Sequence, residues 1–537
     1  MALDDPPPPD NKCKVVIVGA GMAGLSAANH LVKNGVTDFV VLESRNRIGG
    51  RIASIDTNGV RLELGANWIH GVLGNPIYEM AVSSGLVNIV NVPKPHKVVA
   101  STEEGKQVPF SILQEVYEAY MCFLHRCEEY FLCQYLPPTG VESVGEHIEL
   151  EIELYLQRII NRDERHLRRA IFDCLLKRET CISGCTSMSE IDLMELGSYT
   201  ELQGGNIVLP SGYSSILGPV SKPIPEDKIL LRHTVAKIYW GGTDCDDDSD
   251  EDSSSGDSEK TVTGPQSSPK CLDDSRSPSS GVRVVCENGS QFIADTVICT
   301  LPLGVLKQSA DVLFMPRLPE HKRESIERLL FGTVDKIFLL YERPFLNPDI
   351  SEVMLLWDTA SDVKGDMDES WYRKIYSFSK LSETVLLGWV SGKEAEHMET
   401  LSDQVVADKC TEILRKFLND PFVPKPKYCI RTHWFNEPNT RGSYTSIAVG
   451  ASQCDIEAIA QPLYSNADHT KPVVLFAGEH THCSFYSTVH GAYLTGRSCV
   501  QTLLRATEPP PEDLVVECQG TSDLSSWIQG ISLDDPA

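Results

Sequence analysis

Residues 14–24 read Lys-Val-Val-Ile-Val-Gly-Ala-Gly-Met-Ala-Gly, and this stretch decides the fold. The apolar run predicts a strand at Lys14–Val18 that turns directly into a helix. Each glycine has its own reason: Gly19 permits the tight turn, Gly21 lets the backbone approach a pyrophosphate, and Gly24 lets the helix pack closely on the strand. Because a helix that begins here offers unpaired N–H groups to phosphates, the stretch predicts a dinucleotide-binding βαβ unit.

The sequence that follows extends this unit. A second strand is predicted at Phe39–Glu43, and Glu43 lies 19 residues after Gly24, where a carboxylate can accept hydrogen bonds from an adenosine ribose. Residues 48–51 read Ile-Gly-Gly-Arg, so that Gly50 and Arg51 provide a second contact for the pyrophosphate. This second clamp is typical of flavoproteins and not of ordinary NAD dehydrogenases, and it therefore indicates FAD.

A matching motif lies near the other end of the chain. Residues 476–481 read Phe-Ala-Gly-Glu-His-Thr, and residues 486–492 read Tyr-Ser-Thr-Val-His-Gly-Ala. We expect a strand to deliver Gly478 and Glu479 to the ribityl chain and the next helix to point its N-terminus at the isoalloxazine. Since both halves of one cofactor site lie far apart in sequence, the FAD-binding domain is predicted to be discontinuous.

The chain of 537 residues is too long for one core, so two folded domains and some unfolded segments are expected. The predicted class is α/β, or α+β. The Rossmann-like FAD-binding domain takes residues 13–90, 205–310 and 430–505, and a substrate-binding domain inserted into it takes 91–204 and 311–429. Low apolar content predicts a disordered leader at 1–12, an acidic Ser-rich insert at 241–281 between neighbouring strands, and a flexible tail at 506–537.

Composition narrows the possible partners. The net charge of −27 disfavours nucleic acid and favours a cationic partner. No apolar segment reaches the roughly 20 uninterrupted residues that a membrane span needs, so no membrane contact is expected. The 17 cysteines form no C-x-x-C pairs, which predicts free thiols and no metal site. Without an N-terminal signal or a final Ser-Lys-Leu, the chain is expected in the cytoplasm.

Several further motifs are specific to one family. They are Gly65–Gly71, Asn75–Tyr78, Val297–Lys307, Gly332–Phe338, Arg441–Tyr444 and Tyr486–Gly491. Together they resemble the flavin amine oxidase family, and within it the animal spermine oxidases and N1-acetylpolyamine oxidases. The likeness covers about residues 12–505, apart from the acidic insert. It implies a two-domain fold with a mixed sheet in the substrate-binding domain, and non-covalently bound FAD.

The resemblance also implies roles for single residues. Lys336 would hold a water near flavin N5, and as a buried lysine it is expected to have a lowered pKa. His70 would lie at the substrate tunnel and assist in binding or deprotonating the amine. Glu179 would contact the ammonium groups of the substrate.

Other residues would line the tunnel or hold the cofactor. Tyr444 would be one wall of an aromatic cage, with Trp434 packed behind it and against Lys336. Thr488 replaces a second aromatic wall, and Tyr199 would line the tunnel. The remaining residues expected at the cofactor are Trp68, Val235 and Val489.

The implied reaction is the oxidation of a secondary amine of spermine or N1-acetylspermine, with O2 as the second substrate and hydrogen peroxide as a product. Monomers are expected. Oxidation of another amine, such as a protein lysine or an amino acid, stays open, as does a flavin-fold binding protein without turnover. Both preferred substrates need the same motifs, although the expected cytoplasmic location slightly favours spermine.

Overall fold

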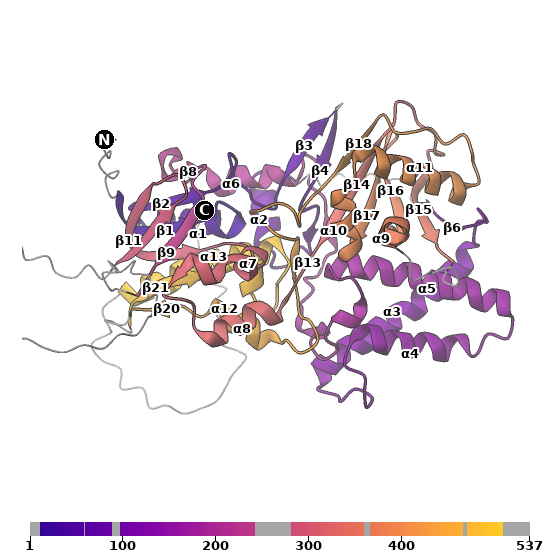
Figure 1. The fold of residues 1–537 in the computed structure, drawn as a ribbon, viewed down its shortest axis with the longest axis horizontal. Helices are drawn as coiled ribbons and strands as arrows, with labels where there is room; N and C mark the ends of the chain where they lie inside the picture. The colour runs from indigo at the N-terminus through magenta and orange to yellow at the C-terminus, as the bar shows by residue number, and fades with distance from the viewer. Residues whose placement is uncertain are drawn as a thin grey trace, which may run out of the picture.

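The computed structural model describes residues 11–57, 59–87, 97–241, 281–358, 366–465 and 470–507. The predictions for the leader, the acidic insert and the tail fall almost entirely outside these residues. Two sheets organise the described chain, and they lie at opposite ends of the elongated molecule in Figure 1.

The first sheet has nine strands and contains both the first and the last strand of the described chain, β1 and β21. Its central path runs β12-β9-β10-β11-β1-β2-β8, and β21 pairs with β11 and β20. The bounds are β1 Asn11–Val18, β2 Phe39–Glu43, β8 Ile229–Leu231, β9 Val235–Tyr239, β10 Val282–Cys286, β11 Gln291–Cys299, β12 Phe314–Met315, β20 Leu463–Tyr464 and β21 Pro472–Phe476. The discontinuous FAD-type domain predicted from the two motifs is therefore confirmed.

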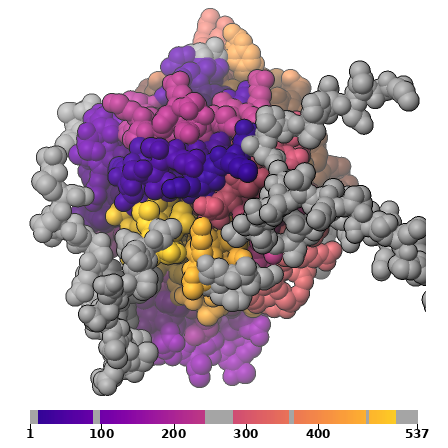
Figure 2. All heavy atoms as spheres, turned by 90° about the vertical axis from the view of Figure 1, so that its left-hand side faces the viewer, coloured from indigo at the N-terminus to yellow at the C-terminus, as the bar shows by residue number. Residues whose placement is uncertain are grey.

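This sheet is buried on both faces where the second half of β1, residues 15–18, is apolar on consecutive positions. Val15 and Ile17 of β1 belong to one hydrophobic cluster, whereas Val16 and Val18 belong to the other. Parallel neighbours on both sides of β1 require such double covering. One face is covered by α1 (Met22–Lys33) and α13 (Val489–Thr507), the other by α7 (Leu303–Leu313), α8 (Glu320–Arg328) and α12 (Gln453–Ala460). Figure 2 shows the N-terminal and C-terminal segments side by side, in indigo and yellow.

The second sheet is mixed, as predicted. Its six strands run in the order β18-β14-β17-β16-β15-β6, and only β15 and β6 are parallel. The bounds are β6 Lys97–Thr102, β14 Val334–Leu340, β15 Ile350–Leu356, β16 Ser377–Ser382, β17 Val385–Ser391 and β18 Tyr428–Arg431.

Two groups of helices cover this sheet (Figure 1). They are α3 Phe110–Cys133, α4 Val144–Leu156 and α5 Arg162–Ser183 in one group, and α10 Lys393–Thr400 and α11 Asp403–Leu418 in the other. Ser402 caps α11 by accepting a hydrogen bond from the Val405 N–H.

The remaining strands and α-helices are short. They are β3 Ser54–Thr57, β4 Val60–Glu63, β5 Ile69–His70, α2 Pro76–Ser83, β7 Asn206–Ile207, α6 Leu217–Ser221, β13 Leu330–Gly332, α9 Met367–Ser370 and β19 Tyr444–Ser446. β12 lies in the first sheet although residues 311–429 were assigned to the second domain, and the exact domain division stays a prediction. Among the described residues, none of the helices has the length and apolar character needed to cross a bilayer.

Candidate active site

The two predicted glycine turns face each other and leave a cradle of the kind a pyrophosphate needs. Gly19 has a φ of +103° and starts the turn after β1. A Cβ on Gly24 would lie 1.9 Å from the Gly19 carbonyl oxygen, so only glycine lets α1 pack this closely. A Cβ on Gly21 would meet no atom within 4 Å, whereas one on Gly50 would lie 3.3 Å from the Gly21 Cα. The geometry fits the dinucleotide reading.

Glu43 lies between these turns at the end of β2, where it is buried. One carboxylate oxygen accepts a hydrogen bond from the Ala20 N–H at 2.8 Å, and the other accepts one from the Arg45 N–H at 2.9 Å. A carboxylate oxygen can accept more than one hydrogen bond, so the ribose role predicted for Glu43 remains chemically available.

Arg51 and Glu479 join the two ends of the chain. The guanidinium of Arg51 donates to the Glu479 carboxylate at 2.9 Å and to the Ser443 carbonyl at 2.7 Å. Burial raises the pKa of Glu479, but Arg51, His480 and the hydrogen bond from the Ser487 N–H more than offset this and hold the pKa below its usual range. The ion pair thus connects the Gly-Gly-Arg turn to the C-terminal motif.

The C-terminal motif positions α13 against α1. A Cβ on Gly496 would lie 2.1 Å from the Ala23 carbonyl oxygen, so the two helices touch through their backbones. Thr488 uses its hydroxyl to accept a hydrogen bond from the Gly491 N–H at 3.0 Å and to donate one to the Phe485 carbonyl at 2.6 Å. It therefore caps the helix start, where Val489 is the first residue. At the other predicted cofactor positions, Val235 is half-buried at the start of β9, and Gly478 lies two residues after the end of β21.

Lys336 is buried in β14, as the sequence predicted. Its Nζ donates to the carbonyl oxygens of Glu63 and Gly65, at 2.7 Å each, and lies 4.8 Å from the centre of the Trp389 ring. Burial lowers the pKa of Lys336 to about 7, although the nearby Glu63 carboxylate opposes the shift. Such a lysine can exchange a proton near neutral pH.

A row of rings leads from Lys336 to His70. Trp68 is stacked on Trp389, with ring centres 5.9 Å apart, and lies 6.4 Å from the His70 ring. The Nδ1 atom of His70 is 3.1 Å from the Asn206 side-chain oxygen, and burial lowers the pKa of His70. The structure therefore joins the two residues expected in catalysis through Trp68 and Trp389.

Trp389 is an aromatic neighbour of Lys336 that was not predicted. Its ring centre lies 4.8 Å from the Lys336 ammonium, because Trp389 is the cross-strand partner of Lys336 and shares its face of the sheet. Trp434, predicted to pack against Lys336, donates from Nε1 to the Leu64 carbonyl at 3.2 Å and lies next to Gly65, whose carbonyl accepts from Lys336.

Glu179 lies in the last turns of α5, and Tyr444 contacts the same turns. The hydroxyl of Tyr444 donates to the Cys181 carbonyl, and its ring lies against Gly184. Burial raises the pKa of Glu179 to about 7, and the neighbouring Glu128 carboxylate adds to the shift, while Arg178 opposes it. A cation that reached Glu179 would favour its ionised form.

Further carboxylates extend from Glu179 toward His70. Burial raises the pKa of Glu128, and so does the nearby Glu201 carboxylate. Glu201 also acts electrostatically on His70 and on Tyr199, whose ring packs edge-on against Tyr486 at 5.7 Å. The structure thus brings Glu179, Tyr199 and His70 into one neighbourhood with two acids that sequence reasoning missed.

The sequence contains little that would have identified Trp389, Glu128 or Glu201 as site residues. Trp389 was detectable only as the partner of Lys336 across two neighbouring strands, and that register cannot be read from one sequence. Glu128 lies on α3 and Glu201 on an irregular segment, and neither belongs to a motif.

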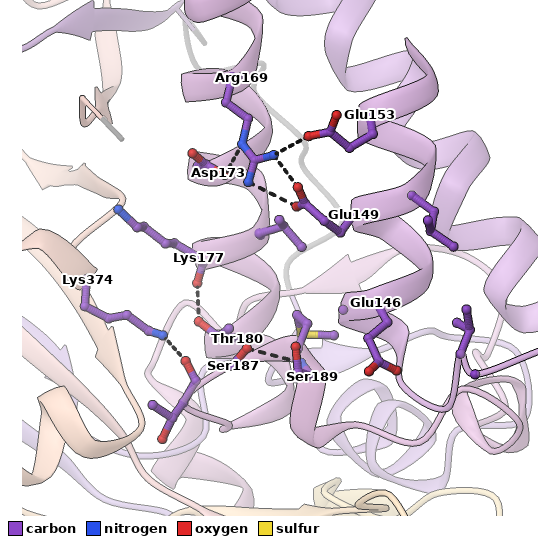
Figure 3. A pocket seen from close by; sticks show the side chains of 17 residues that line it. Glu146, Glu149, Glu153, Arg169, Asp173, Lys177, Thr180, Ser187, Ser189 and Lys374 are labelled. Atoms are coloured by element: carbon purple, nitrogen blue, oxygen red, sulfur yellow. Dashed lines mark hydrogen bonds and ion pairs between the residues drawn. The ribbon is translucent and has the colours of Figure 1, made fainter. Parts of the chain in front are cut away.

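A separate cavity of about 770 Å³ lies between α4 and α5 and contains none of the predicted site residues (Figure 3). Its charged groups largely pair with one another. Arg169 contacts Glu149 and Asp173, and Lys374 donates to the Thr186 carbonyl. We therefore place the candidate active site at Lys336 and not in this cavity.

Comparison with known proteins gives a consistent family. The family described as flavin containing amine oxidoreductase matches residues 22–260 and 271–504. The peroxisomal N(1)-acetyl-spermine/spermidine oxidase of Homo sapiens is 34% identical and covers 92% of this chain and 96% of its own length. The protein of the same name from Bos taurus is 33% identical, with 92% and 95% coverage.

A solved structure agrees on the fold. A redesigned double mutant of putrescine oxidase superimposes with a TM-score of 0.60 at 18% identity. The match covers 93% of this chain and 100% of the other.

Proposed function

Because the chain belongs to the family of flavin-containing amine oxidoreductases and is an FAD-dependent amine oxidase, we propose that its substrate is spermine. The observation that carries this proposal is a set of three carboxylates that interact electrostatically: Glu128 acts on Glu179, and Glu201 acts on Glu128 and on His70. Spermine carries ammonium groups at both ends, whereas N1-acetylspermine has a neutral amide at one end. Several acids near His70 therefore favour spermine over the acetylated amine.

The cofactor supplies the redox chemistry: bound FAD would accept a hydride from the carbon next to a secondary amine and pass the electrons to O2. Glu43, Arg51 and the turns at Gly19–Gly24 and Gly49–Gly50 would hold it. The remaining work falls to the protein, which must bind the amine, orient it and remove a proton from it.

Lys336 would accept a proton from the reacting nitrogen or donate one to it. With its pKa near 7, the side chain can be neutral or protonated at physiological pH. Two of its hydrogen bonds are fixed by the Glu63 and Gly65 carbonyls, so the third direction can hold a water or the substrate. His70, whose pKa is lowered by burial, would accept a hydrogen bond or a proton from the amine as a neutral imidazole.

The substrate is tested by comparing kcat/KM for spermine, N1-acetylspermine and spermidine, with hydrogen peroxide and the shorter amine measured as products. Spermine should give the highest value. A higher kcat/KM for N1-acetylspermine would reject the spermine proposal while leaving polyamine oxidation intact.

Anaerobic reduction of the bound flavin separates the alternatives. Reduction only by peptides that contain methylated lysine would make a protein lysine the substrate, and reduction only by amino acids would make an amino acid the substrate. If neither these compounds nor the three polyamines reduce the flavin, the chain is a binding protein without turnover.

We also propose that the protein acts as a monomer in the cytoplasm. Unpaired cysteines throughout the described residues suit a reducing compartment, although the two relatives compared above are named as peroxisomal. Light scattering after gel filtration would give the mass in solution. Imaging of the full chain against a peroxisomal marker would give the location, and overlap with the marker would reject the cytoplasmic proposal.

A further inference from the structure

Two buried carboxyl groups meet directly behind Lys336. Asp335 precedes it in β14 and is fully buried, and Glu399 lies near the end of α10 with only 7% of its surface exposed. Because side chains alternate along a strand, Asp335 faces away from Lys336. Neither carboxyl has an ion-pair partner among the residues that the structure describes.

Both carboxyls hold the same backbone segment, residues 432–436. One oxygen of Asp335 accepts hydrogen bonds from the Thr432 hydroxyl at 2.5 Å and from the Trp434 N–H at 3.3 Å. The two oxygens of Glu399 accept the N–H groups of Phe435 and Asn436, each at 2.8 Å.

The hydrogen-bond pattern locates a proton. Burial, the negative charge of Glu399 and a hydrogen bond with its carboxylate raise the pKa of Asp335 well above its usual range. Both oxygens of Glu399 already accept N–H groups, whereas the second oxygen of Asp335 is buried and no donor is directed at it. Two adjacent buried carboxylates repel each other strongly, so one of them must carry a proton, and the free oxygen of Asp335 is its place.

We propose that Asp335 is protonated and donates a hydrogen bond to ionised Glu399, and that this acid pair positions the segment 432–436 beside Lys336. Both are positioning residues, since neither touches the reacting atoms.

The segment connects the pair to the active site. Thr432 exchanges hydrogen bonds with the backbone of Lys336, accepting at its hydroxyl from the Lys336 N–H at 2.9 Å and donating its own N–H to the Lys336 carbonyl at 3.1 Å. Trp434 donates to the Leu64 carbonyl, which lies between the two carbonyls that bind the Lys336 ammonium. Loss of the pair should therefore shift both the backbone of Lys336 and the carbonyl groups that bind its ammonium.

Among the described residues, other charged groups near the pair lie on α10 and β18. Glu396 of α10 lies near Glu399, and its pKa is raised by burial and by that charge, with Thr333 and Lys393 opposing. On β18, Arg431 is engaged by Asp403 and by the Met398 and Leu401 carbonyls. Neither group supplies the positive charge that two ionised carboxylates would require.

In the holoenzyme, replacing Asp335 by its amide and replacing Glu399 by its amide should have different effects on stability. Asp335→Asn should fold with a thermal unfolding midpoint at pH 7 close to that of the unmodified protein, because an amide N–H can replace the donated proton. Glu399→Gln should lower the midpoint by on the order of 5 °C, because its amide N–H groups would oppose a backbone N–H. Asp335→Ala should behave like Glu399→Gln. If Asp335→Asn is destabilised as much as Asp335→Ala, the proton is not on Asp335 and the proposal fails.

The pH dependence gives a second readout with a matched control. Because the pKa of Asp335 is raised in the folded protein, its protonation stabilises the fold. This stabilisation is fully present below about pH 4, the ordinary pKa of an aspartate, and is lost as the pH rises above that value. Asp335→Asn has no such loss. The thermal unfolding midpoint of this variant should therefore rise relative to that of the unmodified protein as the pH increases.

Asp455, which is also buried, is the control, because its pKa is shifted in the opposite direction. Burial raises its pKa, but Arg328, Ser325 and the Ser452 N–H hold the pKa below its usual range. Asp455→Asn should therefore lose most stability at neutral pH, and slopes of the same sign for both variants would overturn the proposal.

Infrared spectroscopy tests the proton directly. The difference spectrum between the unmodified protein and Asp335→Asn at pH 7 should contain the carbonyl stretch of a protonated carboxylic acid, shifted in D2O, and the Asp455→Asn difference should lack it. If that band is absent from the Asp335→Asn spectrum, Asp335 carries no proton at pH 7 and the proposal is rejected.

The link to Lys336 rests on the proposed function and is tested separately. Asp335→Ala should lower kcat by about 10-fold with little change in KM, and Asp335→Asn should restore it to within about twofold. Restored stability without restored kcat would confine the pair to a structural role and reject its positioning role, without bearing on which amine is oxidised.

Discussion

Two buried lysines, one on a helix that covers the first sheet and one in a strand of the second, look alike by charge and burial but have different surroundings. Lys322 on α8 and Lys336 in β14 are both buried, and burial lowers the pKa of each to about 7. The Lys322 ammonium donates to three carbonyls at the end of α12, at 2.6 to 2.9 Å, and lies 4.4 Å from the Phe476 ring centre. Lys336 has only two carbonyl acceptors.

The difference lies in the number of donors that remain. An ammonium has three N–H groups, so Lys322 is saturated by the backbone and holds α12 in place. Lys336 keeps one N–H for a further partner. A shifted pKa alone therefore does not distinguish a structural lysine from a functional one, and the count of acceptors does.

The largest expected effect concerns the saturated lysine. Lys322→Met should lower the free energy of unfolding by about 3 kcal/mol, because three carbonyls lose a charged partner. Turnover per folded molecule should stay within about twofold. Urea unfolding measures the first and active-site titration the second. Lys307→Met is the matched control, since Lys307 donates to one carbonyl, that of Glu327. Equal losses for both variants would show that the acceptor count does not matter.

The next effect concerns the unsaturated lysine. Lys336→Met should slow flavin reduction or reoxidation by about 10-fold or more, comparable to the loss of an acid–base group. Its unfolding free energy should fall less than that of Lys322→Met. Stopped-flow absorbance measures both half-reactions, and unchanged rates in both would remove Lys336 from the mechanism.

A smaller effect extends the comparison to an acid whose pKa is also near 7. Glu179→Gln should raise KM for spermine about fivefold, as expected when one charge contact worth about 1 kcal/mol is lost. Since the ionised carboxylate binds the ammonium, KM of the unmodified protein should fall as the pH rises from about 6 to 8 through the pKa of Glu179. Glu179→Gln should lack this fall, and the exposed Glu153→Gln should retain it.

The smallest effect tests the ring beneath Lys336. Trp389→Phe keeps an aromatic face but weakens the cation–π contact, so kcat/KM should fall about twofold to fivefold. The pH at which kcat is half-maximal should also move, because the ring favours the charged lysine. No change in either quantity would leave Trp389 as packing only.

Much of the cofactor site was accessible from sequence because it is built from local backbone geometry. Gly24 and Gly496 are required where two backbones touch, and Glu43 must follow a strand at a set distance from the turn. Such constraints act within a few residues, so they leave a readable spacing. The mixed second sheet followed from family likeness alone.

What the sequence by itself determined is the presence of two half-sites for one flavin, and the family resemblance added the buried lysine. The tertiary structure alone decided which groups surround that lysine. Trp389, Glu128 and Glu201 reach the site, and Asp335 meets Glu399, only through strand register and helix packing between distant segments. The physical reason is that the pKa and the hydrogen bonds of a buried group depend on its neighbours in space, and no local spacing encodes those neighbours.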